Sequence, residues 1–202
     1  MKKYYFLLLP LSLSAQPATE YWDAAQTKKK TEYTLKNGIQ EGKYTAWYQN
    51  GDIAKEGNFR AGKENGKFTT YYQGKKIKQE ENYADGAKQG PWLYWYINGQ
   101  KAQETFFKNN QPDSVWTGWY ENGIQKSKEY YSNGKRTGTW QYFTNKGIPE
   151  SKGTFKNDLQ DGSFVEYYSS GKIHTEGEYV KGKKSSTWKT YFENGSIEEE
   201  IT

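Results

Sequence analysis

Aromatic side chains recur along the chain at a fixed period of 24 residues. Within each repeating unit the third and sixth positions are always aromatic, and the seventh is aromatic in every unit but one. A period of this length indicates a repeat architecture in which each unit packs mainly against its neighbours. The units start, without insertion or deletion, at Gly42, Gly66, Gly90, Ser114, Gly138, Gly162 and Ser186. We number them units 1 to 7 in this order.

Turn-forming residues divide each unit into two short segments. The tenth position is Gly in every unit except unit 2, where Lys75 stands, and Asn-Gly occurs at 50–51, 98–99, 122–123 and 194–195. Asn-Gly between apolar runs is a strong hairpin signal. The twenty-first position is Gly, Asn or Asp, the residues that tolerate positive φ, so it predicts a turn residue near the left-handed region. Each unit is therefore predicted to be a β-hairpin that stacks on the next.

The third, sixth and seventh positions also fit one face of a helix, because they are spaced i, i+3, i+4. Only about eight residues separate the turn signals, however, and an isolated helix that short is marginal. Glycine at both ends of each segment also disfavours a helix. Aromatic and β-branched residues between turns instead suit a pleated surface.

Composition alone would suggest disorder, because mean hydropathy is −1.16 and only 33% of residues are hydrophobic. The aromatic content of 18% argues against disorder, since Trp, Tyr and Phe each bury a large apolar area. We therefore expect a folded, all-β protein with a thin aromatic core.

The chain divides into three parts. Residues 1–15 read as a secretory signal peptide, with Lys2 and Lys3 before a short apolar run and small residues before Gln16. The run is too short for a membrane span; a buried N-terminal strand is the alternative. Residues 16–30 lack the repeat and are read as a linker or N-terminal cap. Residues 31–202 form the repeat domain, which begins with a partial unit.

The units resemble a known family. The pattern G-x-W-x-x-Y-Y-x-N-G-x-I-x-x-E-x-x-Y-x-x-G, which residues 162–182 follow closely, is similar to the bacterial MORN-repeat variant, whose members include proteins labelled as antitoxin components of toxin–antitoxin systems. The resemblance covers residues 31–202. It implies an elongated single-layer sheet of stacked β-hairpins, and a role in holding partners or membranes. A weaker resemblance is to choline-binding cell-wall repeats, which lack the recurrent Glu at the fifteenth position.

Catalytic and metal chemistry find little support in the sequence. There is no cysteine and a single histidine, His174, at a position that varies between units, so we expect no enzyme activity, no metal site and no cofactor. Carboxylates at the fifteenth position could form a glycosidase pair. Identical units would give them like environments, whereas a working pair needs unlike ones. Pairing with Lys across strands is the simpler reading.

The charge pattern also narrows the choice of partners. Lys and Glu are interleaved along the chain, so the sequence has no basic stripe to which a nucleic acid would bind. We also expect the protein to be a monomer. A protein partner is the first hypothesis, a glycan, cell wall or membrane surface the second, and a toxin paired with this chain as antitoxin or immunity-type protein the third. With a signal peptide, the protein would act in the periplasm, in the cell envelope or outside the cell.

The sixth and seventh positions point to opposite faces of a strand, so both faces of the sheet carry rings. Either one row packs the units and the other is exposed as an interaction site, or both rows only stabilise the stack. The sixth position is also expected to contribute to packing between units, so that Trp119→Ala is costly and His174→Ala is not. The candidate binding row is the sixth position: Trp47, Tyr71, Trp95, Trp119, Phe143, Tyr167 and Tyr191.

We predict that the exported protein begins at or near Gln16, because the charged, apolar and small residues of 1–15 follow the order of a cleaved signal. Mass spectrometry of the N-terminal peptide, on protein recovered from the cell envelope and medium, should find this start. Recovery of chains that begin only at Met1 would contradict export by this route.

Overall fold

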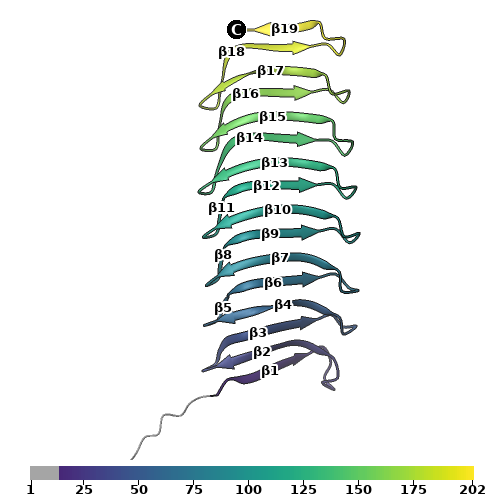
Figure 1. Cartoon of the computed structure of the whole chain (residues 1–202), viewed down its shortest axis with the longest axis vertical. Helices are drawn as coiled ribbons and strands as arrows, with labels where there is room; N and C mark the ends of the chain where they lie inside the picture. The colour runs from purple at the N-terminus through teal and green to yellow at the C-terminus, as the bar shows by residue number, and fades with distance from the viewer. Residues whose placement is uncertain (1–13) are drawn as a thin grey trace, which may run out of the picture.

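The computed structural model describes residues 14–202, which form a single open sheet with no helix among them (Figure 1). All paired strands are antiparallel, so the polypeptide climbs the sheet hairpin by hairpin. The predicted all-β, elongated, single-layer fold is confirmed. The predicted signal peptide falls largely on residues 1–13, which lie outside the described residues.

The sheet contains 19 strands. Three of them, β5, β8 and β11, are only two residues long. Each pairs with the same long strand as the strand that follows it, so that β5 and β6, for example, both pair with β4. The bounds are β1 Gln16–Tyr21, β2 Lys29–Lys36, β3 Ile39–Trp47, β4 Ile53–Arg60, β5 Lys63–Glu64, β6 Gly66–Tyr71, β7 Ile77–Ala84, β8 Ala87–Lys88, β9 Gly90–Trp95, β10 Lys101–Lys108, β11 Gln111–Pro112, β12 Ser114–Trp119, β13 Gln125–Ser132, β14 Lys135–Phe143, β15 Pro149–Lys156, β16 Leu159–Tyr167, β17 Ile173–Val180, β18 Lys183–Tyr191 and β19 Ile197–Ile201.

Two kinds of turn alternate along the stack. At the twentieth and twenty-first positions both residues have positive φ, as in Asn133 (50°) and Gly134 (81°), which is the two-residue type I′ loop that suits twisted strands. The predicted positive φ at the twenty-first position is confirmed in every unit that reaches it. The other turn has three loop residues and ends on the tenth-position Gly, with φ near 90° at Gly51. Lys75 takes positive φ (68°) at this place in unit 2.

Two irregularities per unit decide which side chains share a face. The first residue of every unit has positive φ, and the register shifts after the fifth residue, as between Ala46 and Trp47. Such bulges shift the pairing with the neighbouring strand, whereas the side chains between them alternate regularly between the two faces. The third, sixteenth and eighteenth positions therefore lie on one face, which we call the core face. The fourth, sixth and fifteenth positions lie on the other, which we call the row face.

The core is a row of rings on the core face, formed by the third and eighteenth positions in alternation and interrupted once, between Phe155 and Phe164. Their centroids lie 4.7–5.9 Å apart in successive pairs. The buried hydrophobic side chains among residues 14–202 all come from this row: Phe68, Trp92, Phe107, Trp140 and Trp188. Third-position tryptophans also donate Nε1–H to a carbonyl oxygen ten residues earlier, as Trp140 does to Tyr130 (3.1 Å).

The expectation that the sixth position carries the packing between units is therefore wrong. Its rings are half-buried, and none of the close ring pairs among the described residues involves it. The physical reason is strand alternation, because the third and sixth positions are three residues apart on one strand and their side chains therefore point to opposite faces. No second layer of structure covers that face in the described chain (Figure 1).

Residues 16–30, read as a linker or cap, include a strand of the sheet. β1 pairs along its length with β2, starting with Gln16 opposite Leu35. Trp22, after β1, donates its Nε1–H to the carbonyl oxygen of Trp47 (3.1 Å) and so attaches this segment to unit 1.

We predict that the two aromatic rows differ in their effect on stability. Trp140→Ala should lower the free energy of unfolding by about 3–5 kcal/mol, because it empties a buried site in the core row. Trp119→Ala should cost no more than about 2 kcal/mol, since that ring is half-exposed. Urea melts give both values, and His174→Ala, expected within about 0.5 kcal/mol, is the surface control. Equal losses at Trp140 and Trp119 would contradict the assignment of the core.

Candidate functional site

The sixth-position aromatics form one file along the row face. They come from the end of one strand in each unit, namely β3, β6, β9, β12, β14, β16 and β18. Each ring is half-buried, so part of its surface faces solvent. With two strands per unit at about 4.8 Å, successive rings are spaced roughly 10 Å apart along the stack. The structure therefore brings the predicted residues together as a periodic, partly exposed row.

Carboxylates of the fifteenth position lie beside this row and hold some of its rings. The Tyr71 hydroxyl donates to Glu56 Oε1 (2.5 Å), and the Tyr191 hydroxyl donates to Glu176 Oε1 (2.7 Å). The hydrogen bond to Glu56, together with burial, raises the pKa of Tyr71 to about 12. The hydrogen bond to Glu176 likewise raises the pKa of Tyr191 above its ordinary value. These phenols are thus neutral donors that orient their rings against the preceding unit.

Two lysines, one ahead of unit 1 and one at the twelfth position of unit 3, lie over tryptophans of the row. Lys29 Nζ is 5.6 Å from the ring centroid of Trp47, and Lys101 Nζ is 5.3 Å from that of Trp119. Lys101 also pairs with Glu104 at 2.8 Å. The flanks of the row therefore carry charges of both signs that are already paired within the sheet.

The row face carries further apolar residues in units 3 and 4, beside the row itself. On the same face, Phe106 at the end of β10 pairs across strands with Pro91, and Tyr130 on β13 pairs with Val115. Val115 is 37% exposed. Trp95 and Trp119 lie in the same units. The centre of the row face is therefore an apolar and aromatic patch, whereas the corresponding positions of units 1 and 6 are polar or charged. Sequence reasoning missed this patch because the second and seventeenth positions vary between units.

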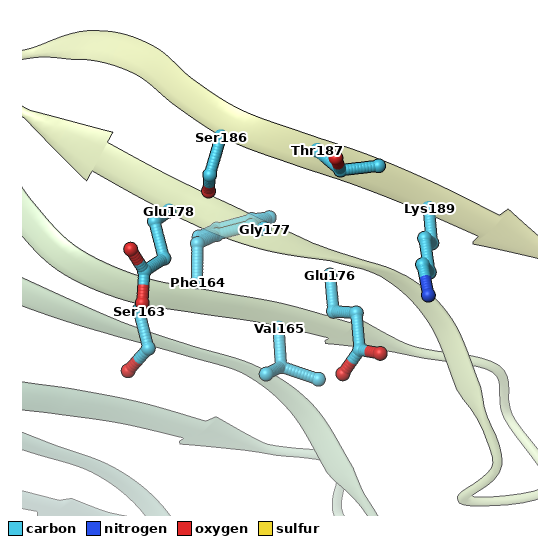
Figure 2. Close-up of a pocket in the computed structure, with 9 residues that line it drawn as sticks. All are labelled: Ser163, Phe164, Val165, Glu176, Gly177, Glu178, Ser186, Thr187 and Lys189. Carbon is cyan, nitrogen blue, oxygen red and sulfur yellow. The ribbon is translucent and has the colours of Figure 1, made fainter. Parts of the chain in front are cut away.

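A shallow hollow lies on the row face between units 6 and 7 and is shown in Figure 2. Glu176 on β17 and Lys189 on β18 are paired across the strands and extend to the same side of the sheet, as the figure shows. Its other polar side chains are Ser163, Glu178, Ser186 and Thr187. A similar hollow recurs between units 1 and 2, lined by Lys43, Glu56, Asn58, Lys67 and Thr69. Each is a dip between neighbouring hairpins, produced by the repeat itself.

Seventh-position tyrosines connect each unit to the next, directly behind the row. The Tyr96 hydroxyl donates to the carbonyl oxygen of Trp119 (2.9 Å), which is a row residue 23 positions later. The same bond is made by Tyr48, Tyr72, Tyr120 and Tyr168. This tyrosine ladder fixes the backbone at the base of each row ring. The near-constant Tyr at the seventh position was the available signal, but periodicity does not reveal which acceptor it reaches.

The single histidine lies beside the seventh-position tyrosine of unit 6. His174 packs against the Tyr168 ring, with centroids 4.6 Å apart, and its Nδ1 is 3.9 Å from Glu166 Oε2 at the surface. Residues 14–202 contain no group of three potential metal ligands. None of the described residues forms a helix that could span a membrane.

The raised pKa of Tyr71 predicts a stability change at alkaline pH. Because the folded-state value lies above that of the unfolded chain, the contribution is complete below about pH 10 and is lost as pH rises towards about 12. Tyr71→Phe should flatten the fall in free energy of unfolding over this range, and Glu56→Gln should return the phenol towards its ordinary pKa. Urea melts and ultraviolet titration of tyrosinate measure the two effects. An unchanged titration curve in Glu56→Gln would contradict the assigned cause.

Comparison with known proteins addresses the repeat directly. No curated protein matches the chain. A solved structure described as "Crystal Structure of TcdB2-TccC3-Cdc42" is similar over 88% of this chain at 8% identity, with a TM-score of 0.24, and this chain spans only 14% of its length. So distant a likeness carries no argument about function. The profile of the MORN repeat variant matches residues 40–61, 64–85, 88–109, 136–157, 160–181 and 186–202. These segments make up more than half of the chain, which belongs to the MORN repeat variant family.

Proposed function

We propose that this protein is a non-enzymatic scaffold that binds a protein partner along the row face. The observation that carries the proposal is the file of seven partly exposed rings on one face of an open sheet. Trp and Tyr are the residues that most often dominate protein interfaces, because they bury much area at little entropic cost. A row exposed over several units suits an elongated contact better than a small molecule.

The chemistry of the face defines the kind of partner. The central patch around Phe106 and Val115 would take apolar side chains. Towards either side, pairs such as Lys101–Glu104 and Lys67–Glu80 leave the face with charges of both signs. A strongly acidic or basic partner therefore gains little from this surface. We expect an extended protein segment with apolar residues at its centre and mixed charge around them.

A neutral polysaccharide is the second candidate. Rings spaced regularly along a line, with carboxylates such as Glu56 and Glu176 beside them, are able to stack on sugar faces and accept hydrogen bonds from hydroxyl groups. An antitoxin or immunity role would be a special case of the first proposal, in which the protein partner is a toxin. Export fits either candidate: β1 begins at Gln16, so removal of residues 1–15 would leave the sheet complete.

The proposal predicts that binding depends on the centre of the row. Trp95→Ala and Trp119→Ala, each at a half-exposed ring, should weaken partner binding by at least tenfold if they lie at the centre of the interface. Phe192→Ala is the matched control, because Phe192 is an exposed aromatic (48%) that does not belong to the row. The free energy of unfolding is measured for each variant so that loss of fold is separated from loss of binding.

The measurement uses residues 16–202 as bait for cross-linking and affinity capture from the cell envelope, followed by titration of the captured protein. Phe106→Ser with Val115→Ser provides a second test that spares the row tryptophans. Binding to insoluble cell-wall glycan is assayed in parallel with the same variants, and retention there would favour the second candidate. Protein binding that is unaffected by every row-face variant would overturn the proposal.

A further inference from the structure

Successive units are held together by side-chain contacts that recur at almost every junction. The tyrosine ladder crosses from the seventh position to the sixth of the next unit. The core row adds a ring pair from the eighteenth position to the next third position, and Trp Nε1–H adds a hydrogen bond back across the same junction. At the junction between units 4 and 5, for example, Tyr120, Trp140 and the Tyr131–Trp140 ring pair supply all three.

The junction between unit 5 and unit 6, where β15 pairs with β16, differs from the others. The seventh residue of unit 5 is Thr144, whose hydroxyl accepts from the amides of Lys146 and Ile148 in its own turn. The third residue of unit 6 is Phe164, which has no ring N–H to donate. No tyrosine or tryptophan hydrogen bond therefore ties these two units together.

The core row is also interrupted here. Phe155 of unit 5 pairs backwards with Trp140 at 5.0 Å, and Phe164 of unit 6 pairs forwards with Tyr179 and Trp188. Within residues 14–202, no close ring pair, salt bridge or side-chain hydrogen bond joins residues 138–161 to residues 162–185. All the other junctions from unit 1 to unit 7 have at least two such contacts.

What remains at this junction is backbone pairing and van der Waals contact. β15 and β16 keep an antiparallel register, and the amide of Gly182 donates to the Gln160 carbonyl oxygen at 2.8 Å. The bulge at Gly162 is more open than elsewhere, with φ of 113° against 58–81° at the first position of the other units. A glycine accepts that conformation readily. An independent feature of the backbone thus changes at the same place as the side-chain contacts.

We propose that the β15–β16 junction is a built-in hinge that divides the sheet into two blocks, residues 16–161 and 162–202. In a repeat stack, stability is approximately a sum of unit and nearest-neighbour terms, so an opening motion concentrates at the weakest interface. Flexing there changes the angle between the last two rings of the row, Tyr167 and Tyr191, and the five before them. The proposal stands on the contacts alone and does not depend on the identity of the ligand.

Native-state amide hydrogen exchange on residues 16–202, read by mass spectrometry, tests the hinge. Amides that bond across β15–β16 should exchange at least about tenfold faster than those across β13–β14, the matched junction with all three contacts. They should also exchange faster than those across β17–β18, which lies nearer the end of the sheet. Equal rates at β15–β16 and β13–β14 would overturn the proposal. Fastest exchange at β17–β18, with a smooth gradient inwards, would overturn it in favour of fraying from the end.

Two double variants test whether the missing hydrogen-bond donors cause the difference between the junctions. Thr144→Tyr with Phe164→Trp restores the missing donors, and should slow exchange across β15–β16 by about tenfold or more. Tyr120→Thr with Trp140→Phe removes the same donors from the junction between units 4 and 5, and should create a second fast site there. A restored variant that folds but leaves the exchange rates across β15–β16 unchanged would contradict the assigned cause. If either variant does not fold, the comparison of β15–β16 with β13–β14 in the wild-type chain decides the outcome.

Discussion

The whole structure depends on burying rings within a sheet that has no second layer. In most β proteins a strand buries one face against another sheet or a helix. Here the third-position ring of one strand must be covered by the eighteenth-position rings on either side. Phe68 reaches 1% exposure in this way, between Phe59 and Tyr83. Small residues beneath the rings help: a Cβ on Gly57 would lie 2.3 Å from Phe68, so the ring lies directly on the backbone.

This arrangement makes each unit dependent on its neighbours. A single hairpin with one aromatic face is marginal in water, and the ring contacts become complete only when a second hairpin is added. The hydrogen bonds of the tyrosine ladder act in the same direction, since each joins a side chain of one unit to the backbone of the next. The same geometry leaves the rings of the row face partly exposed, because the ring pairs of the core all lie on the opposite face.

The fixed period and the turn residues were sufficient to predict the stacked hairpins and the positive φ at residues such as Gly134, and the resemblance to MORN repeats implied the open sheet. They were not sufficient to predict which aromatic row is buried. Alternation places the third and sixth positions on opposite faces, but it does not say which row is covered by the eighteenth position of the neighbouring strands. That depends on the strand register, which the bulges at the first residue and after the fifth set, and a bulge leaves little trace in the pattern. The ladder acceptors were missed because a periodic tyrosine does not reveal the atom to which it donates, and the strand at residues 16–21 was missed because it lies ahead of the repeats.

The spacing of the ladder bonds has a consequence for how such a chain can change its length. Each tyrosine hydroxyl reaches a carbonyl 23 residues ahead, and each tryptophan reaches one ten residues behind. Removing or duplicating one whole unit leaves both separations intact at the new junction. Adding a single residue inside a unit would instead change the separation for the bonds that span the insertion and invert the faces of the strand that follows. The length of the row face therefore changes in steps of one whole unit, which adds or removes one ring and one hairpin. Duplication or deletion of a gene segment that encodes one unit is the change that preserves the structure.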